Sequence, residues 1–225
     1  MNDYAIVIAG GRIYDDFALR FLRPYVGKTD RPMIIAADRG LVFLERNGIV
    51  PDVVVGDFDS VPDGYEEQYL RSHPHVEMHR YQWEKDYTDT EIAARRAMDH
   101  GCKIIDFIGT TGTRFDHMLG SVQLLAMLIE RGVVGRIIDP YNRITMHEQS
   151  FRIWKKSQWG KYVSLFSWGG DVRGVTLTGF HFPMENGHIT SAQTLTVSNQ
   201  IEEDCAEVRF DRGMLLLVES RDKAL

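Results

Sequence analysis

The sequence predicts an α/β domain with a parallel sheet, followed by an all-β domain of the sandwich or barrel type. Short apolar runs alternate with amphipathic stretches up to about residue 140. These runs are apolar at successive positions, as strands of a parallel sheet must be when helices cover both faces. After Tyr141 the pattern changes to short alternating segments that are broken by glycines and charged turns. Such segments at regular spacing are typical of a sandwich or barrel.

The first part supplies six strand candidates and five helix candidates in alternation. The strand candidates are YAIVIA, PMIIAA, DVVVGD, VEMHRY, KIIDFIG and GRIID. The helix candidates have apolar residues at three-and-four spacing and span Asp16 to Val26, Gly40 to Asn47, Tyr65 to Ser72, Thr88 to His100 and Phe115 to Arg131.

The second part supplies strand candidates without a convincing helix. They are RITMHE, FRIWKK, KYVSLFSW, RGVTLTGFHF, QTLTVSN, AEVRFD and MLLLVES. The change of pattern predicts one domain over residues 1–141 and a second over residues 142–225, with no low-complexity linker between them.

Composition narrows the class of protein. With 44% hydrophobic and 26% charged residues, the 225-residue chain is typical of a globular protein. Its net charge of -6, without a basic cluster, argues against a nucleic-acid partner. Cys102 and Cys205 lie far apart without metal-type spacing, as expected in a reducing compartment. The amino-terminal segment does not resemble a signal peptide, and the apolar runs are shorter than a membrane span. We therefore expect a cytoplasmic protein without a membrane partner.

Two aspartates follow the third strand candidate in the stretch GDFDS. Residues two apart in an extended segment point the same way, so Asp57 and Asp59 would present both carboxylates to one spot. Such a pair raises one pKa unless a cation lies between the carboxylates, and Mg²⁺ prefers oxygen ligands. Gly56 leaves room for a ligand. The alternative is a solvated turn in which Asp59 or Ser60 caps the next helix.

A second acidic group lies in KDYTDTEIA, where Asp86 and Asp89 flank Thr88. Thr88 with Glu91 three residues later is a capping box, which explains much of the pattern by itself. A lysine beside such a cap is not needed for capping. Lys85 could neutralise a phosphate and Asp89 could complete a metal site.

A third group lies in FIGTTGTRFDHMLGSV, where a glycine and threonine loop leads into a helix. The free N–H groups at such a helix start can bind an anion, and the Arg114 guanidinium suits phosphate oxygens. Asp116 and His117 could orient that arginine, hold a base or cap the helix. A histidine at such a place is more often structural than catalytic.

The stretch MIIAADRG adds Asp38 and Gly40 at another strand end. Four strand ends thus carry acids, glycine or arginine at one edge of the predicted sheet, where open parallel sheets bind ligands. The segment before VGKT has Leu22 where a Walker A loop needs its first glycine, and no nucleophile motif is present. The set favours metal-assisted phosphoryl or pyrophosphoryl transfer.

The motifs AADRG, PDVVVGDFDS, KDYTDTEIA and GTTGTRFDHMLGSVQLL, in this order, resemble the thiamin pyrophosphokinases, and the resemblance continues through VRGVTLTGFHFPM to TVSN. The resemblance implies transfer of a pyrophosphoryl group from ATP to thiamin. It also implies a nucleotide-binding α/β domain, a β-sandwich that helps to bind thiamin, and a homodimer with active sites between its subunits.

The resemblance assigns expected roles to three sets of residues. The Mg²⁺-binding acids would be Asp57, Asp59 and Asp89. The ATP site would comprise Asp38, Gly40, Lys85, Thr88, Arg114 and Asp116. The thiamin segment would comprise Thr196, Ser198 and Asn199. Catalysis would depend on alignment and charge neutralisation, with Asp57, Asp59, Asp86 and Arg114 at the reacting groups and one of these three acids accepting the hydroxyl proton.

The sequence departs from the family pattern at three positions and leaves two alternatives open. Arg39 and Thr113 replace glycines, which bears on loop conformation and nucleotide affinity, and Ser121 replaces an asparagine. One alternative is pyrophosphoryl transfer to another hydroxymethyl compound such as a pterin. The other is a protein that binds nucleotide or thiamin diphosphate without turnover.

Overall fold

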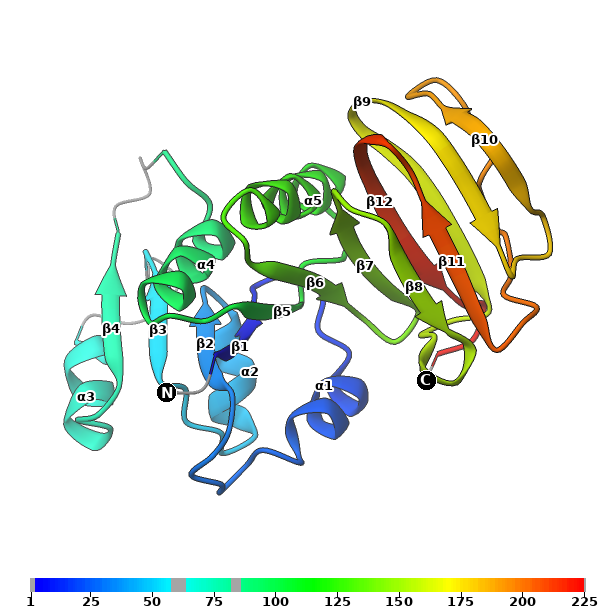
Figure 1. The fold of residues 1–225 in the computed structure, drawn as a ribbon. Coiled ribbons are helices and arrows are strands. Elements are labelled where there is room, and N and C mark those ends of the chain that lie inside the picture. The colour runs from blue at the N-terminus through cyan, green and yellow to red at the C-terminus, as the bar shows by residue number, and fades with distance from the viewer. Residues whose placement is uncertain (1–2, 58–63, 82–85, 225) are drawn as a thin grey trace. The chain divides into compact units, whose positions relative to one another are not determined.

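The computed structural model describes residues 3–57, 64–81 and 86–224 (Figure 1). The chain divides into two compact units, Met1–Leu124 and Leu125–Leu225, and the division falls within helix α5 (Phe115–Ile129). The predicted class, a parallel-sheet α/β part followed by a β-rich part, is confirmed. The domain boundary expected between residues 141 and 142 stays a prediction.

The first unit is built on a parallel sheet with β1 (Tyr4–Ile8) inside it. Its remaining strands are β2 (Met33–Ala37), β3 (Val53–Gly56), β4 (Glu77–Arg80) and β5 (Ile104–Ile108). They lie in the order β4-β3-β2-β1-β5, and every neighbouring pair is parallel. The interior strands are buried along nearly their whole length because their apolar residues face helices on both sides. All the strands therefore end at the same edge.

Helices connect these strands. Besides α5 they are α1 (Asp15–Leu22), α2 (Gly40–Arg46), α3 (Tyr65–Ser72) and α4 (Asp89–Asp99). Helix α4 packs on β1, β2 and β3 through small buried residues such as Ala93 and Ala97. The prediction that α1 reaches Val26 was wrong. The helix ends at Leu22. Arg23 still has helical dihedral angles, but Pro24 has no N–H to continue the helical hydrogen bonds.

The second unit is an antiparallel arrangement of strands (Figure 1). These are β6 (Val134–Ile138), β7 (Asn142–His147), β8 (Phe151–Trp154), β9 (Tyr162–Thr178), β10 (Met184–Ile189), β11 (Cys205–Arg209) and β12 (Arg212–Ser220), with a 3-10 turn at Lys155–Ser157. Their order is β6-β7-β12-β9-β11-β8, and β10 pairs with β9. Strand β6, which we grouped with the parallel strands, pairs antiparallel with β7.

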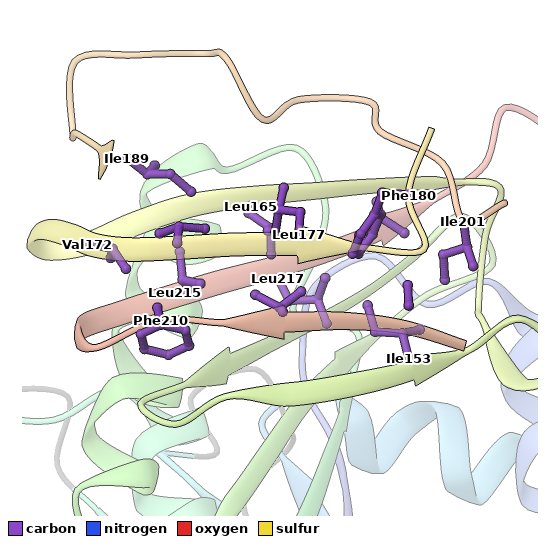
Figure 2. Close-up of a cluster of buried hydrophobic side chains, with 14 residues drawn as sticks. Ile153, Leu165, Val172, Leu177, Phe180, Ile189, Ile201, Phe210, Leu215 and Leu217 are labelled. Carbon is purple, nitrogen blue, oxygen red and sulfur yellow. The ribbon is translucent and has the colours of Figure 1, made fainter. Parts of the chain in front are cut away.

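A hydrophobic core fills the space between β8, β9, β10, β11 and β12 (Figure 2). Alternate residues of the strands point into it, including Val163 and Leu165 of β9 and Leu215 and Leu217 of β12. Each such fully buried side chain stabilises the fold by about 1.5–3 kcal/mol relative to an exposed one. The β-rich unit therefore has a core of its own.

Three strand predictions for the second unit were wrong in detail. KYVSLFSW and RGVTLTGFHF are parts of the single strand β9, which continues through Gly169 and Gly170, both at positive φ. This lets β9 pair first with β12 and then with β10 and β11. QTLTVSN forms turns instead of a strand. Strand β10 was missed because it is mostly exposed and lacks an apolar alternation.

None of the helices in the described ranges has both the length and the apolar character needed to cross a membrane.

Candidate active site

Acidic residues of the first unit lie where neighbouring parallel strands end. Asp38 directly follows β2, and Asp57 directly follows β3. The two loops are joined at this point, because the Asp38 N–H donates to the carbonyl of Val55 at 2.9 Å. Asp89 is the first residue of α4, which packs on the same strands. The edge that the sequence predicted thus collects acids from three loops.

The Asp38 carboxyl shows that these acids lie close together. Partial burial raises its pKa, a hydrogen bond from the Arg39 N–H lowers it, and the negative charges of Asp89 and Asp57 raise it further. Asp38 also has a left-handed backbone with φ of 51°. Left-handed geometry is uncommon outside glycine, and it turns the chain sharply from β2 toward α2. Two of the predicted acids, Asp57 and Asp89, therefore lie close enough to Asp38 to repel its negative charge.

Two glycines let the main chain approach this group closely. A Cβ atom on Gly40 would lie 1.9 Å from the Ile8 carbonyl oxygen, so only glycine allows α2 to begin against β1. A Cβ on Gly10 would lie 2.6 Å from Oδ2 of Asp38. The loop after β1 therefore packs on the acidic group. Our sequence reasoning missed this loop, although its two adjacent glycines after a strand were a usable signal.

The loop after β5 packs on the other side of the β1 loop. The Gly11 N–H donates to the Gly109 carbonyl at 2.9 Å, and a Cβ on Gly11 would lie 2.3 Å from that oxygen. Gly109 itself has φ of 80°. Thr110 is only 7% exposed, and its hydroxyl oxygen has no hydrogen-bond partner within the described residues. The glycine and threonine loop is therefore ordered against β1 with a polar atom left unsatisfied.

Arg114 and Asp116 form an ion pair at the start of α5. The Arg114 guanidinium donates to both Asp116 oxygens, with an Nε to Oδ1 distance of 3.2 Å. This bond lowers the pKa of Asp116 and raises that of Arg114, although both side chains are exposed. The arrangement agrees with the idea that Asp116 orients the arginine. Their roles in ATP binding stay predictions.

The cap proposed for Thr88 is present. Its hydroxyl oxygen accepts the N–H of Glu91 at 3.2 Å and caps α4. Asp86 is described and exposed, whereas Asp59 and Lys85 lie outside the described residues. Within the described residues, no group of three or more His, Cys, Asp or Glu side chains is arranged to hold a metal ion. The Mg²⁺ site, which includes Asp59, stays a prediction.

The three departures from the family pattern fit the local structure. Arg39 has φ of -60°, so its position does not require glycine. Thr113 is exposed and is not among the described residues with positive φ. Ser121 is buried and donates to the His117 carbonyl at 2.9 Å.

The residues predicted to contact thiamin lie in the second unit, and two of them are bonded inside it. The Asn199 amide accepts the Phe182 N–H at 3.0 Å and donates to its carbonyl at 2.8 Å. Thr196 is buried and donates to the Leu165 carbonyl. Ser198 is exposed, with φ of 60° and its N–H bonded to Ser164 Oγ. Of the three predicted side chains, that of Ser198 is the one exposed to solvent.

Phe182 is a candidate residue that the sequence analysis did not select. The residue is 62% exposed, while its main-chain N–H and carbonyl are both bonded to the Asn199 amide. An exposed ring on a fixed main chain can stack on an aromatic ligand. Its place next to the assigned TVSN segment becomes visible only in the folded chain.

Two family models match the chain. The model for the thiamin pyrophosphokinase catalytic domain matches residues 28–134, and the model for the thiamin pyrophosphokinase vitamin B1 binding domain matches residues 148–215. Asp38, Asp57, Asp89 and Arg114 all lie in the first match, and Phe182 and Ser198 lie in the second.

Relatives match most of the chain. The thiamine pyrophosphokinase of Bacillus subtilis is 35% identical over 197 residues, which cover 87% of this chain and 91% of that protein. A crystal structure of the enzyme from the same species covers 98% of this chain and 100% of its own, with 32% identity and a TM-score of 0.84. The structure from Geobacillus thermodenitrificans covers 98% of each chain, with 30% identity and a TM-score of 0.81. The edge of acids and glycine loops described above thus belongs to a member of the thiamin pyrophosphokinase family.

Proposed function

We propose that this chain catalyses the reaction for which its family is named, the transfer of a pyrophosphoryl group from ATP to thiamin, which gives thiamin diphosphate and AMP. The observation that carries the proposal is the acidic group at the carboxyl edge of the parallel sheet, where Asp57 and Asp89 lie close enough to Asp38 to repel its negative charge. Carboxylates gathered in this way fit a site for a divalent cation and a polyphosphate.

The donor set suits Mg²⁺. Carboxylate oxygens are the ligands that Mg²⁺ prefers, and Asp57 and Asp89 both lie close enough to Asp38 for their charges to raise its pKa, beside the larger effect of burial. Asp57 and Asp89, with Asp59 from the same loop as Asp57, would hold the ion. When bound, Mg²⁺ neutralises phosphate oxygens and polarises the phosphoryl group.

The side chains around this group would position the triphosphate. Arg114 would contact phosphate oxygens with a guanidinium that Asp116 already holds in place. Lys85 would add a second cation. The N–H groups of the loop after β5 and the first turn of α5 would supply further donors. Asp38, Gly40 and Thr88 would line the ATP site beside these groups.

The reaction needs alignment more than covalent chemistry. The thiamin hydroxyl would attack the β-phosphorus of ATP while AMP leaves, and one of Asp57, Asp59 or Asp86 would accept the hydroxyl proton. Arg114 and Lys85 would stabilise the charge that develops on the transferred group.

The acceptor is proposed to be thiamin because the second family model is that of a vitamin B1 binding domain. Phe182 offers an exposed ring on which a pyrimidine or thiazolium ring could stack, and the exposed Ser198 lies one residue from the Asn199 that fixes Phe182. Thr196 and Asn199 would support this surface through their internal hydrogen bonds. Nothing in the comparisons supports a pterin acceptor or a binding protein without turnover.

We also infer a homodimer and a cytoplasmic location. Light scattering of the purified protein would test the homodimer, which would appear at twice the 25.8 kDa mass of one chain. Fractionation of cells would test the location.

The central experiment is an assay of AMP release. Purified protein is incubated with ATP, Mg²⁺ and either thiamin or a hydroxymethyl pterin. We expect AMP and thiamin diphosphate in equal amounts with thiamin, and no AMP with the pterin or without Mg²⁺. AMP release with the pterin but not with thiamin would show that the acceptor is a pterin. ATP binding without AMP release would refute the transferase activity.

A further inference from the structure

We propose that Arg12, in the loop after β1, binds the polyphosphate of the nucleotide donor. This inference rests on the proposed function and adds a residue to its site. The match to the catalytic-domain model begins at residue 28, so Arg12 lies outside it. Arg114, the arginine that the sequence suggested, is paired with Asp116, whereas Arg12 lies over the ring of Tyr14.

The structure fixes Arg12 beside the glycine and threonine loop that follows β5. A Cβ atom on Gly112 would lie 3.1 Å from the Arg12 nitrogen and 3.3 Å from its Cβ, so these two chain segments are in contact. The bond from Gly11 N–H to the Gly109 carbonyl, at 2.9 Å, joins the same two loops one residue earlier. The main chain of Arg12 is therefore held against the loop that leads to Arg114.

The positive charge of Arg12 is not neutralised by a carboxylate of the described residues. Its guanidinium lies 4.7 Å from the centre of the Tyr14 ring, and the residue is exposed. Arg114, in contrast, donates to both oxygens of Asp116. A guanidinium over an aromatic ring keeps its charge and its N–H donors for an anion. Arg12 is thus better suited than Arg114 to bind a phosphate without first losing a partner.

The order of the strands places Arg12, in the loop after β1, between the acidic residues and the loop after β5. The sheet runs β3-β2-β1-β5, so the acids after β3 and β2 lie on one side of the β1 loop and the loop after β5 lies on the other. A polyphosphate with its cation carries both signs of charge. Its cation would face Asp57 and Asp38, and its phosphate oxygens would face Arg12 and the unsatisfied hydroxyl of Thr110.

Binding measurements on matched variants test this inference. We would prepare Arg12→Gln, Arg12→Lys and Arg114→Gln, with Arg23→Gln as the control because Arg23 is an exposed arginine at the end of α1. Calorimetry with Mg²⁺ would measure Kd for a non-hydrolysable ATP analogue and for inorganic tripolyphosphate, which lacks the base. AMP release would give KM and kcat for ATP and for thiamin.

We expect Arg12→Gln to weaken both probes by roughly ten- to a hundredfold, the loss typical of a charge-assisted hydrogen bond. The KM for ATP should rise by a similar factor while that for thiamin stays unchanged. Arg12→Lys should lose less than about tenfold because it keeps the charge but not the bidentate fork. Arg23→Gln should change Kd by less than about twofold, as expected for an exposed charge away from the site.

The outcomes separate this inference from the proposed function. Equal affinities for Arg12→Gln and Arg23→Gln overturn the role of Arg12 even if the enzyme turns over thiamin normally. If the wild-type protein releases no AMP but the binding contrast persists, the reaction is refuted while Arg12 remains a phosphate-binding residue. If the wild-type protein binds neither probe, the inference is overturned. Arg12→Ala repeats the test should the glutamine variant melt at a much lower temperature than the wild-type protein.

Discussion

Two carboxylates, Glu219 in the β-rich unit and Asp38 in the α/β unit, have opposite surroundings. In the β-rich unit, Glu219 is almost fully buried and accepts from Arg143 at 2.6 and 2.8 Å and from the Trp159 N–H at 2.9 Å. The amide of Asn199 is likewise bonded inside the unit. At the acidic edge of the α/β unit, partial burial raises the pKa of Asp38, and the negative charges of Asp89 and Asp57 raise it further.

The difference distinguishes polar groups that stabilise the fold from polar groups that are suited to bind a ligand. Buried polar groups with internal partners cost little and position the chain, whereas like charges gathered at an edge weaken the unliganded fold. A bound cation would supply positive charge to these carboxylates, and a polyphosphate could bind to that cation. Glu219 already has its cation, Arg143, so we expect substitution of Glu219 to affect stability and the edge substitutions to affect activity.

The largest effect should follow from Glu219→Gln, which leaves the charge of Arg143 without its partner. Breaking a buried ion pair in this way should lower the free energy of unfolding by about 3–5 kcal/mol. Glu207→Gln is the matched control, because Glu207 forms an exposed cross-strand pair with Arg152 and its loss should cost less than about 1 kcal/mol. Urea unfolding of both variants measures the difference. Equal losses would show that the buried pair does not stabilise the β-rich unit.

Asp57→Asn should lower the activity without lowering the stability of the protein. We expect kcat/KM for thiamin-dependent AMP release to fall on the order of a thousandfold, or about 4 kcal/mol of transition-state stabilisation. The melting temperature should stay equal or rise, since the substitution removes repulsion with Asp38. Asp99→Asn, at the far end of α4, carries the same charge change and should retain activity. Near-normal turnover of Asp57→Asn would remove Asp57 from the metal site.

His147 should make the β-rich unit sensitive to acid. Burial lowers its pKa from 6.5 to about 4, and it stacks on Phe151 at 3.9 Å between ring centres. The unfolded chain therefore binds the proton first, so stability is complete above pH 6.5 and is lost as pH falls toward 4. The loss can reach about 3 kcal/mol. Unfolding at several pH values should show this slope, and His147→Gln should flatten it. An unchanged slope in that variant would assign the acid sensitivity to other groups.

The smallest effect, of opposite sign, concerns Asp38. Its folded pKa is raised, so its contribution favours the fold below the usual aspartate range and is lost as pH rises through the folded pKa. At neutral pH, Asp38→Asn should therefore stabilise the unliganded protein, by less than about 1 kcal/mol because the side chain is partly solvated. Asparagine also accepts the left-handed backbone at this position. Thermal melting without ligand measures the gain, and a lower melting temperature would contradict the repulsion inferred for the edge.

The acidic edge could be predicted from sequence because it depends on simple rules. Apolar runs identified the strands, and parallel strands must end together, so residues directly after them had to meet. Asp38 and Asp57 followed from this reasoning alone. Whether they bind Mg²⁺ stays a prediction, since Asp59 lies outside the described residues.

Features that depend on contacts between distant segments could not be predicted in the same way. Arg12 carries no signal of its own, and its place became visible only when Gly112 was found against it. The alternation in QTLTVSN imitated a strand, but its apolar residues Leu195 and Val197 are exposed, whereas Thr196 and Asn199 are buried and bonded to distant main-chain groups. An apolar alternation therefore does not by itself show which residues are buried.

Gly40 has a consequence for how variants of this enzyme should be interpreted. Even the methyl group of alanine would be forced into the main-chain carbonyl of Ile8, which cannot rotate away as a side chain could. The whole of α2 would have to retreat and carry Asp38 with it. Loss of activity in Gly40→Ala would thus result from displacement of α2 and Asp38. It would resemble the loss caused by a carboxylate substitution, although every reactive group is still present.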